Sequence, residues 1–428
     1  MKVTADPLVR QLESELGADA VSAEPSALAA HAVDGKVPAL ICVPATPEQL
    51  AAVLRICREK EAAVIPWGGG TAMAIGNPPR RADVILKTHR LDRIIDHDHA
   101  NLTVTVQSGR TLNALQAALA PQKQYAPLDP PFAHHATVGA IVAANLNGPR
   151  RSSHGSVRDL VIGMKVVLGT GEQIKAGGKV VKNVAGYDMG KLFAGSLGTL
   201  GIITEVTLRV APIAQSGATV IINGTLDQAI QLANALADSK LLPSAVFLRN
   251  VASEQAWQLA IRFEGFEPTV ARQLGDLESM AQRFAMRANS LSVDHEQQIW
   301  QELGNLPLAP DRLVYRVTVP RRSVAAAMVA LPRSWPAPQI PTIIVDIVMG
   351  TLWVICPANK IAAAYFFELT SLARQAHGHA VLFAAPAELK SGIEVWGPTP
   401  PAFSLMRQIK QRFDPKAILN PGRFVGGL

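Results

Sequence analysis

Three glycine-rich segments contain the residue types that bind a phosphorylated cofactor. The first reads Pro66-Trp67-Gly68-Gly69-Gly70-Thr71 and follows an apolar run. Consecutive glycines lack a β-carbon, so the backbone can turn tightly and direct several N–H groups at phosphate oxygens. Such a run alone is also typical of a flexible turn. Its place at the end of a predicted buried strand favours a diphosphate ligand, such as that of a flavin dinucleotide.

Two further segments of small residues follow later in the chain. Residues 136–148 read ATVGAIVAANLNG, and residues 195–203 read GSLGTLGII. Their alanines and glycines permit close approach of a flat ring or a sugar. Thr137, Asn145 and Asn147 are suited to its polar edges. Each segment alone is also typical of a close-packed helix or turn, but the three in this order favour one cofactor site.

The elements around the first loop predict a strand–helix–strand unit. Strands are predicted over residues 39–43 and 62–65, with a helix between them. Thr46 is its predicted N-cap, Pro47 occupies its first position, and Gln49 completes a capping box. The glycine loop therefore lies at the end of a strand that the helix helps to bury.

The sequence pattern of the rest of the chain changes at about residue 212. Before it, the pattern predicts a helical lead-in over residues 1–35, a hairpin of residues 93–96 and 103–107, a helix capped by Thr111, and strands ending at 167, 175 and 210. After it, helices over 227–239 and 268–288 alternate with strands over 245–249, 259–263, 314–319 and 343–349. We therefore predict an α+β protein with domains 1–212 and 213–390 and a C-terminal segment 391–428.

Composition excludes several classes of protein. The chain has 428 residues, of which 48% are hydrophobic and 18% charged, typical of a packed globular protein. The net charge of +7 is spread along the sequence with few aromatic residues, which argues against nucleic-acid binding. Cys42, Cys57 and Cys356 lack metal-type spacing, so an iron–sulfur cluster bound by this chain's cysteines is excluded.

The N-terminus and the most apolar stretch lack the patterns of targeting or membrane-spanning segments. Residues 1–6 lack the apolar core of a signal peptide. The stretch 341–358 contains Asp346 and is divided by Gly350, so it predicts a β-hairpin of residues 342–349 and 351–355 rather than a membrane span. We expect a cytoplasmic protein that meets the inner membrane only through partners.

The ordered motifs resemble a known family. The segments at 66–71, 136–140, GGKVVKNVAGYD (177–188) and GSLGTLGI (195–202) are similar to the FAD domain of the vanillyl-alcohol-oxidase-like flavoproteins. The terminal FDPKAILNPGRF (413–424) resembles the returning tail of FAD-linked oxidases of 2-hydroxy acids. The chain is most similar to the FAD-binding subunits of bacterial glycolate oxidases. The resemblance implies a two-subdomain PCMH-type FAD-binding domain, an α+β cap (substrate) domain and a tail that returns to the flavin.

The resemblance also implies roles for individual residues. The diphosphate would lie on the first loop, with Thr137 and Gly139 beside the diphosphate and ribityl chain. Gly201 and Ile203 would lie on the adenine side, and Gly148 and Asn420 near the ring. Lys182 would belong to a connector below the flavin, or it is a solvated loop lysine. The implied FAD-binding residues are Pro66, Trp67, Gly68, Gly69, Gly70, Thr71, Thr137, Gly139, Gly148, Gly201, Ile203 and Asn420.

Two departures from the family pattern refine the prediction. Some relatives bond the flavin covalently to a histidine of the first loop, and this chain has Trp67 followed by glycines there. The resemblance therefore implies non-covalent FAD. Many hydroxy-acid dehydrogenases of the family have a glutamate where this chain has Leu197, and the loss of that charge favours the FAD-binding subunit over its larger partner.

No catalytic residue is assigned from the sequence, and no metal site is predicted. His377 and His379 would share one side of a strand, which suits two metal ligands, or they are ordinary strand histidines. His134 and His135 are either ring contacts or loop residues. Arg249 and Arg316 are candidates for holding a carboxylate, or they are solvent-side charges, as strand arginines usually are.

The resemblance predicts oxidation of glycolate to glyoxylate, with electrons passing from FAD to an iron–sulfur partner subunit beside a second flavin subunit. One alternative is a non-catalytic subunit whose FAD relays electrons or stabilises the complex. Another is a stand-alone D-2-hydroxy acid dehydrogenase, for example for D-lactate. A third, an FAD-dependent reductase of the cell-wall precursor type, is disfavoured by the Asn-Pro-Gly tail at 420–422.

Overall fold

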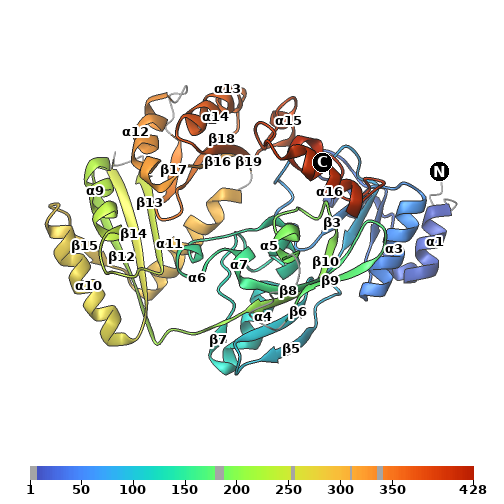
Figure 1. Ribbon diagram of the computed structural model, residues 1–428, viewed down its shortest axis with the longest axis horizontal. Helices are drawn as coiled ribbons and strands as arrows, with labels where there is room; N and C mark the ends of the chain where they lie inside the picture. Colours follow the sequence, from blue (N-terminus) through green and yellow to red (C-terminus); the bar gives the residue numbers. More distant parts are fainter. Residues whose placement is uncertain (1–6, 179–187, 252–255, 309–310, 335–340) are drawn as a thin grey trace. The chain divides into compact units, whose positions relative to one another are not determined.

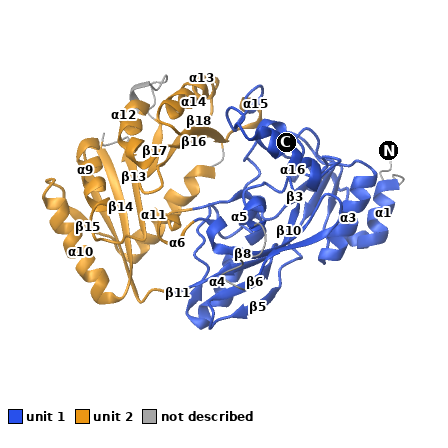
Figure 2. Ribbon diagram, in the orientation of Figure 1, with its two compact units in different colours: residues 1–147, 156–212, 390–428 blue, residues 148–155, 213–389 orange. Residues whose placement is uncertain are grey.

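The computed structural model describes residues 7–178, 188–251, 256–308, 311–334 and 341–428 (Figure 1). The chain forms two compact units, coloured separately in Figure 2. Unit 1 comprises residues 1–147, 156–212 and 390–428, and unit 2 comprises residues 148–155 and 213–389. Unit 1 is therefore assembled from three stretches of chain, one of them C-terminal.

The first sheet of unit 1 carries the first glycine loop. Its strand order is β1 (Val21–Ser22), β2 (Leu40–Cys42), β4 (Val84–Lys87) and β3 (Val64–Trp67), with β2 and β3 parallel to β4. Helix α3 (Pro47–Glu59) connects β2 to β3, and α1 (Pro7–Leu16) packs against it. Buried side chains of α3 and of the strands form one core, so the end of β3 is held rigidly.

The N-terminus of α3 follows the predicted capping pattern with one change. Thr46 Oγ1 accepts a hydrogen bond from the Gln49 amide at 3.2 Å, as predicted for the N-cap. The Gln49 side chain accepts from the amide of Ala45 at 2.8 Å, one residue before the partner that a capping box requires. Both bonds fix the direction in which the chain enters the helix.

The second sheet of unit 1 is antiparallel, in the order β5 (Ile94–Asp98), β6 (Thr103–Gln107), β10 (Ile202–Arg209), β8 (Val161–Val167) and β9 (Gln173–Gly177). The predicted hairpin of β5 and β6 is confirmed. Helices α4 (Leu112–Leu119) and α5 (Val138–Ala144) share a hydrophobic core with this sheet. The short elements of unit 1 are α2 (Pro25–Ala30), β7 (Gln124–Tyr125), α7 (Val157–Leu160), α8 (Gly190–Phe193) and β11 (Ala211–Pro212).

The C-terminal segment of unit 1 returns to the first sheet. After α16 (Phe403–Phe413), the chain forms a parallel bridge between Leu419 and Val64. The Val64 amide donates to Ile418 O at 2.8 Å, and the Asn420 amide donates to Val64 O at 2.9 Å. Residues at the end of the sequence thereby lie beside the strand that leads into the first glycine loop.

Unit 2 is built on an eight-stranded sheet in which the described strand pairs are antiparallel. Its order is β15 (Ala288–Ser290), β12 (Ser216–Gly224), β14 (Ala256–Gly265), β13 (Ala245–Val251), β17 (Thr342–Asp346), β18 (Thr351–Pro357), β16 (Arg312–Thr318) and β19 (His379–Ala384). Helices α9 (Leu226–Ala237) and α10 (Glu267–Gln282) lie on one face, and α11 (Val293–Asn305) lies on the other (Figure 1). The other helices described in this unit are α6 (Arg151–His154), α12 (Val324–Ser334), α13 (Lys360–Ala364), α14 (Phe366–Gln375) and α15 (Ala387–Lys390), whose last residue belongs to unit 1.

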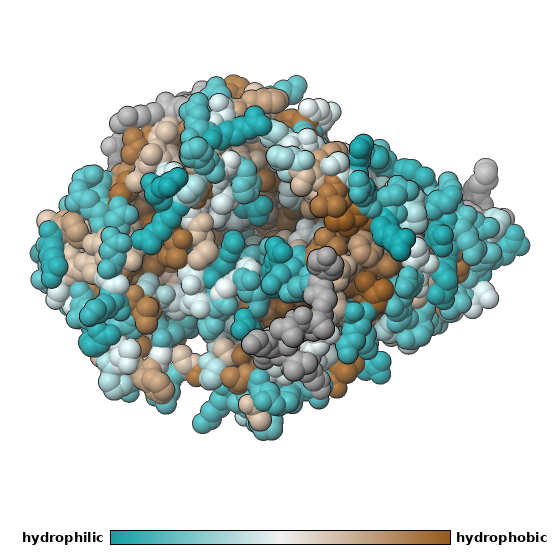
Figure 3. Space-filling view, viewed as in Figure 1, coloured by the Kyte–Doolittle hydropathy of each residue, from teal (hydrophilic) through white to brown (hydrophobic). Residues whose placement is uncertain are grey.

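Two sequence predictions for unit 2 have different outcomes. The apolar hairpin is confirmed as β17 and β18, and no helix in the described ranges is long and apolar enough to cross a bilayer. The helix predicted over 268–288 is wrong at its end. It stops at Gln282, and Ala285 adopts a left-handed backbone (φ 55°) that turns the chain into β15. On the face drawn in Figure 3, hydrophilic residues are spread over both units.

Candidate functional site

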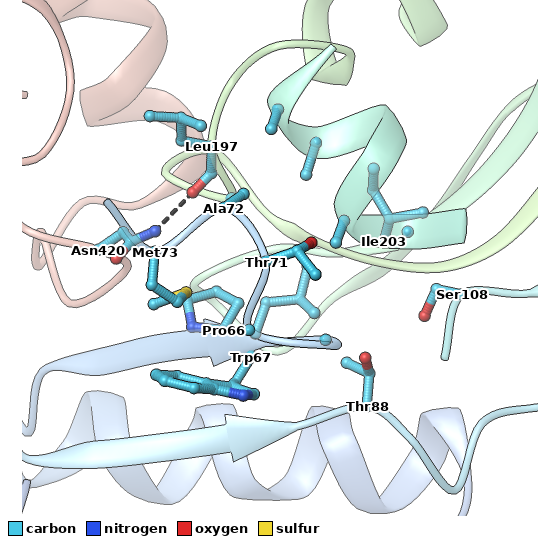
Figure 4. Close-up of a pocket in the computed structure, with 18 of the residues that line it drawn as sticks. Pro66, Trp67, Thr71, Ala72, Met73, Thr88, Ser108, Leu197, Ile203 and Asn420 are labelled. Carbon is cyan, nitrogen blue, oxygen red and sulfur yellow. Dashed lines mark hydrogen bonds between the residues drawn. The ribbon is translucent and has the colours of Figure 1, made fainter. Parts of the chain in front are cut away.

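A pocket in unit 1 lies where the three predicted segments meet (Figure 4). The Trp67 ring lies beside β3 on one side, and α5 crosses the pocket on the other. Of the residues predicted for the cofactor, those that line it are Pro66, Trp67, Gly68, Gly70, Thr71, Gly139, Gly201, Ile203 and Asn420. The other lining residues are Ala72, Met73, Thr88, Ser108, Ala140, Ala143, Ala144, Leu197, Gly198, Ile202 and Arg423.

The first glycine loop presents unused backbone donors. Within the described residues, the amides of residues 68–71 donate no hydrogen bond to another protein group. The loop also lies tightly against the segment before α5. A β-carbon on Gly69 would lie 1.7 Å from the His135 carbonyl oxygen. Glycine is therefore required at position 69 by the fold, and the free amides are what remains available to a ligand.

The start of α5 forms the adjoining wall. The Gly139 amide donates to Ser108 O at 2.8 Å, and a β-carbon on Gly139 would lie 2.6 Å from Ser108 Cβ. Thr137, the N-cap residue of α5, is 2% exposed and lies next to Gly68, although it is not among the lining residues. This packing holds Ser108 against the start of α5 and Thr137 against the first glycine loop.

Several buried polar atoms in or next to the pocket have no hydrogen-bond partner among the described residues. They are Thr71 Oγ1, Ser108 Oγ, Thr137 Oγ1, Asn420 Oδ1 and Arg423 Nε. A buried polar atom without a partner costs about 1–3 kcal/mol, so native proteins seldom concentrate several in one place. A polar ligand that hydrogen-bonds these atoms would remove that cost.

Asn420 is oriented by the turn at 195–199. Its Nδ2 donates to Leu197 O at 2.6 Å, the bond drawn in Figure 4. Because the amide nitrogen faces a carbonyl, Asn420 Oδ1 is left as an acceptor. Leu197 has a left-handed backbone (φ 52°), and its own amide donates to Ala143 O at 2.8 Å. Leu197, which stands where many relatives have a glutamate, thus contributes an apolar side chain and a carbonyl oxygen that holds the Asn420 amide.

Arg423 supplies positive charge to the pocket. Its Nη2 donates to Met73 O at 2.7 Å and also to Ile75 O. Burial lowers the pKa of Arg423 to about 10, and the nearby Asp34 opposes that shift. The guanidinium therefore remains protonated at neutral pH, with its buried Nε still without a partner in the described chain.

The comparisons with known proteins agree with this geometry. Residues 38–177 match the FAD binding domain, and residues 398–424 match the C-terminal domain of FAD linked oxidases. The glycolate oxidase subunit GlcE of Escherichia coli (strain K12) is 30% identical over 368 residues, which cover 84% of this chain and 92% of that protein. The chain belongs to the family of FAD-linked oxidases. The predicted FAD cofactor is confirmed.

Other members of the FAD-linked oxidase family match to different extents. The glycolate oxidase subunit GlcD of Bacillus subtilis is 33% identical over 211 residues, which span 45% of that protein. A D-lactate dehydrogenase of Archaeoglobus fulgidus is 26% identical over 424 residues, which span 91% of that protein. The chain is thus similar along its length to a glycolate oxidase subunit and to a D-lactate dehydrogenase.

Solved structures show the fold. An alkyldihydroxyacetonephosphate synthase superposes with a TM-score of 0.75 at 18% identity, over 98% of this chain and 86% of that one. A substrate-bound p-cresol methylhydroxylase superposes with a TM-score of 0.73 at 16% identity, over 97% and 96% of the two chains. The predicted α+β, PCMH-type fold is therefore confirmed.

The FAD-linked oxidase tail is fastened by two buried ion pairs. Lys390 Nζ lies 2.9 Å from Asp34 Oδ1 and donates to Ala74 O at 2.7 Å. Lys410 Nζ lies 2.7 Å from Asp414 Oδ2 and donates to Thr199 O at 2.8 Å and Leu419 O at 2.9 Å. Burial lowers the pKa of both lysines, and their carboxylate partners oppose that shift. Each lysine therefore joins segments that lie far apart in the sequence.

Some sequence-predicted residues lie elsewhere. Gly148 belongs to unit 2, and its place near the flavin ring stays a prediction. The residues of the 177–188 motif that include Lys182 lie outside the described chain. His134 and His135 are not among the lining residues. The prediction that His377 and His379 share a strand face is wrong, because His377 lies in a left-handed turn (φ 58°) and β19 begins at His379.

Sequence reasoning missed several lining residues. Ser108 directly follows β6 and precedes Gly109, so a polar residue at a strand end beside a glycine was the available signal. Arg423 belongs to the tail motif, from which only Asn420 was assigned. Thr88 and Met73 lie in segments without a distinctive pattern, and only the fold brings them to the pocket.

Proposed function

We propose that this chain is the FAD-binding subunit of a glycolate oxidase complex that oxidises glycolate to glyoxylate. The observation that supports this most directly is the similarity to E. coli GlcE over 92% of that protein's length. In this proposal, electrons leave through FAD to an iron–sulfur partner subunit, and a second flavin subunit completes the complex. We place the complex in the cytoplasm, where partners provide any contact with the inner membrane.

The cysteines of this chain support a relay supplied by another subunit. Cys42, Cys57 and Cys356 are all buried. Burial raises the pKa of Cys42 to about 12 and raises that of Cys57 further. Buried thiols of this kind are poor cluster ligands, since the thiolate is the form that binds metal.

The proposed FAD contacts follow from the free donors and acceptors of the pocket. The amides of residues 68–71 and the Thr71 hydroxyl would hold the diphosphate, with Thr137 and Gly139 beside it. Gly201 and Ile203 would lie on the adenine side, and Asn420 and Gly148 near the ring. None of the described lining residues is histidine, cysteine or tyrosine, which supports non-covalent attachment.

When bound, FAD would accept a hydride from the α-carbon of the substrate and then pass the electrons on. The residues of unit 1 position that cofactor and surround it with donors. Among the lining residues that the structure describes, none is a carboxylate, histidine or lysine that would take the hydroxyl proton. The base is therefore to be sought outside these lining residues.

That observation also favours a second candidate, a subunit whose FAD only relays electrons or stabilises the complex. The full-length similarity to the A. fulgidus D-lactate dehydrogenase supports a third, a stand-alone D-2-hydroxy acid dehydrogenase.

Anaerobic spectroscopy of the purified chain separates the candidates. We expect a yellow protein whose flavin is released by acid precipitation, as for non-covalent binding. If the chain oxidises substrate itself, glycolate bleaches the flavin band, and D-lactate serves as the competing substrate. Bleaching by D-lactate alone would favour the stand-alone dehydrogenase, and bleaching only after addition of co-purified partner subunits would favour the relay. A colourless folded chain that takes up no FAD contradicts all three.

A further inference from the structure

Arg316 lies on the face of the unit 2 sheet opposite the α13–α14 helices. Residues directly opposite one another in a sheet share a face, and the register places Arg316 opposite Trp353, Trp353 opposite Ile344, and Ile344 opposite Arg249. The neighbouring Tyr315 points to the other face, where its hydroxyl bonds Ala362 O. Arg316 and Arg249 therefore project from the same side of the sheet.

The two arginines have different partners. Arg249 donates to Glu302 Oε1 on α11 and to Gln258 Oε1, both at 2.9 Å. The guanidinium carbon of Arg316 lies 5.1 Å from the centroid of the Phe383 ring and 5.9 Å from that of Trp353. Across the described ranges, no carboxylate pairs with Arg316. Among the residues that the structure describes, only these ring faces meet its charge, which leaves the N–H donors of its fork available.

The surroundings of Arg316 add positive charge. Burial, and to a smaller extent the charge of Arg151 on α6, lower its pKa to about 10. The pKa of His379 is lowered by burial and by Arg316. Helix α6 is fixed within unit 2, because Arg150 pairs with Glu264 at 3.0 Å and Ser152 Oγ donates to Ser244 O at 3.0 Å. A half-buried cation in such a setting lacks the anion that would offset its repulsions.

We propose that Arg316 is the anchor for the carboxylate of the 2-hydroxy acid substrate, and this inference rests on the proposed function. The guanidinium fork matches a carboxylate in two parallel hydrogen bonds. Trp353 and Phe383, whose ring centroids lie 4.8 Å apart, hold that fork in place and offer apolar contact to a short carbon chain. Arg249 has its carboxylate already, so the structure separates two arginines that the sequence left equivalent.

Calorimetric titration of the FAD-loaded chain with sodium oxalate, a two-carbon dicarboxylate that cannot be oxidised to a keto acid, tests the inference. We expect oxalate to bind, and Arg316→Met to weaken that binding by ~30-fold or more, as for loss of one partner of a charge pair. Arg316→Lys keeps the charge without the fork and is expected to weaken it by roughly tenfold. Arg249→Met, on the same face, is the matched control and should bind oxalate as the wild type does.

The flavin absorbance of each variant reports folding independently of the anion. Unchanged oxalate affinity in either folded Arg316 variant, or equal loss in Arg249→Met, would overturn the inference. A wild-type chain that retains FAD but binds no oxalate also overturns it and leaves the FAD-subunit proposal intact. A chain that binds oxalate but cannot retain FAD would overturn the FAD-subunit proposal and leave the anion-binding role of Arg316 intact.

Discussion

In unit 1 the buried lysines Lys390 and Lys410 each pair with a carboxylate and with at least one backbone carbonyl, whereas in unit 2 Arg316 contacts two aromatic rings without a carboxylate in the described chain. The two lysines are buried, whereas Arg316 is half-buried. The paired lysines fasten segments of the protein to each other. Arg316, which has no carboxylate partner in the described chain, leaves its charge available to an anionic ligand. A cation that is paired with a carboxylate thus indicates a structural role, and a cation without such a partner in the described chain indicates a ligand-binding role.

The largest effect is expected from removing one partner of a saturated pair. Lys410→Met leaves Asp414 buried and charged, and it also frees the Thr199 and Leu419 carbonyls. Breaking such a pair costs about 3–5 kcal/mol of unfolding free energy, and the displaced tail should release FAD as well. Urea denaturation and flavin retention measure the two effects. Lys416→Met, which removes a surface pair with Glu61, is the control and should change neither.

An intermediate effect is expected at an unsatisfied hydroxyl. Thr137→Val keeps the shape of the side chain but removes the buried Oγ1 that has no described partner. We expect FAD affinity to fall by about tenfold, as for loss of one hydrogen bond. The FAD-free protein should be equally stable or slightly more stable, because a buried polar atom without a partner is gone. Fluorescence titration with FAD and thermal unfolding of the FAD-free chain would show the two opposite responses. A parallel loss of stability and affinity would mean that the hydroxyl is structural.

The smallest effect is expected from Arg316 in the absence of ligand. If its charge is unsaturated, Arg316→Met should raise the melting temperature of the ligand-free chain by about 2 °C, corresponding to roughly 1 kcal/mol. Arg249→Met removes a satisfied ion pair and should give no increase. Differential scanning calorimetry of both variants makes the comparison. A lower melting temperature for Arg316→Met would assign Arg316 to the architecture.

Local signals predicted the elements better than the connections between them. Thr46 and Thr111 cap the helices that follow them, as expected, because capping depends on residues within one turn. The bridge between Val64 and Leu419 joins residues more than 350 positions apart, and the return of the tail was predicted from the family resemblance rather than from a local pattern. The helix end at Gln282 was missed because the left-handed residue there is alanine rather than glycine.

The same distinction applies to the candidate site. The glycine segments carry their chemistry in consecutive residues, so their meeting at one pocket was predictable from motif order. The contact between Lys410 and Thr199 was not predictable from the sequence, since a lysine on a helix ordinarily faces solvent. Arg249 and Arg316 are alike in sequence, and only the position of Glu302 on α11 distinguishes them.

The bridge of Leu419 to β3 has a consequence for how the protein matures. Residues 418–423 leave the ribosome after every other wall of the pocket has been synthesised, yet they complete it through Asn420 and Arg423. A nascent chain can fold its early sheets, but its binding site is unfinished until residues 418–423 have been synthesised, so cofactor loading follows that step. A chain truncated before residue 418 would therefore be colourless.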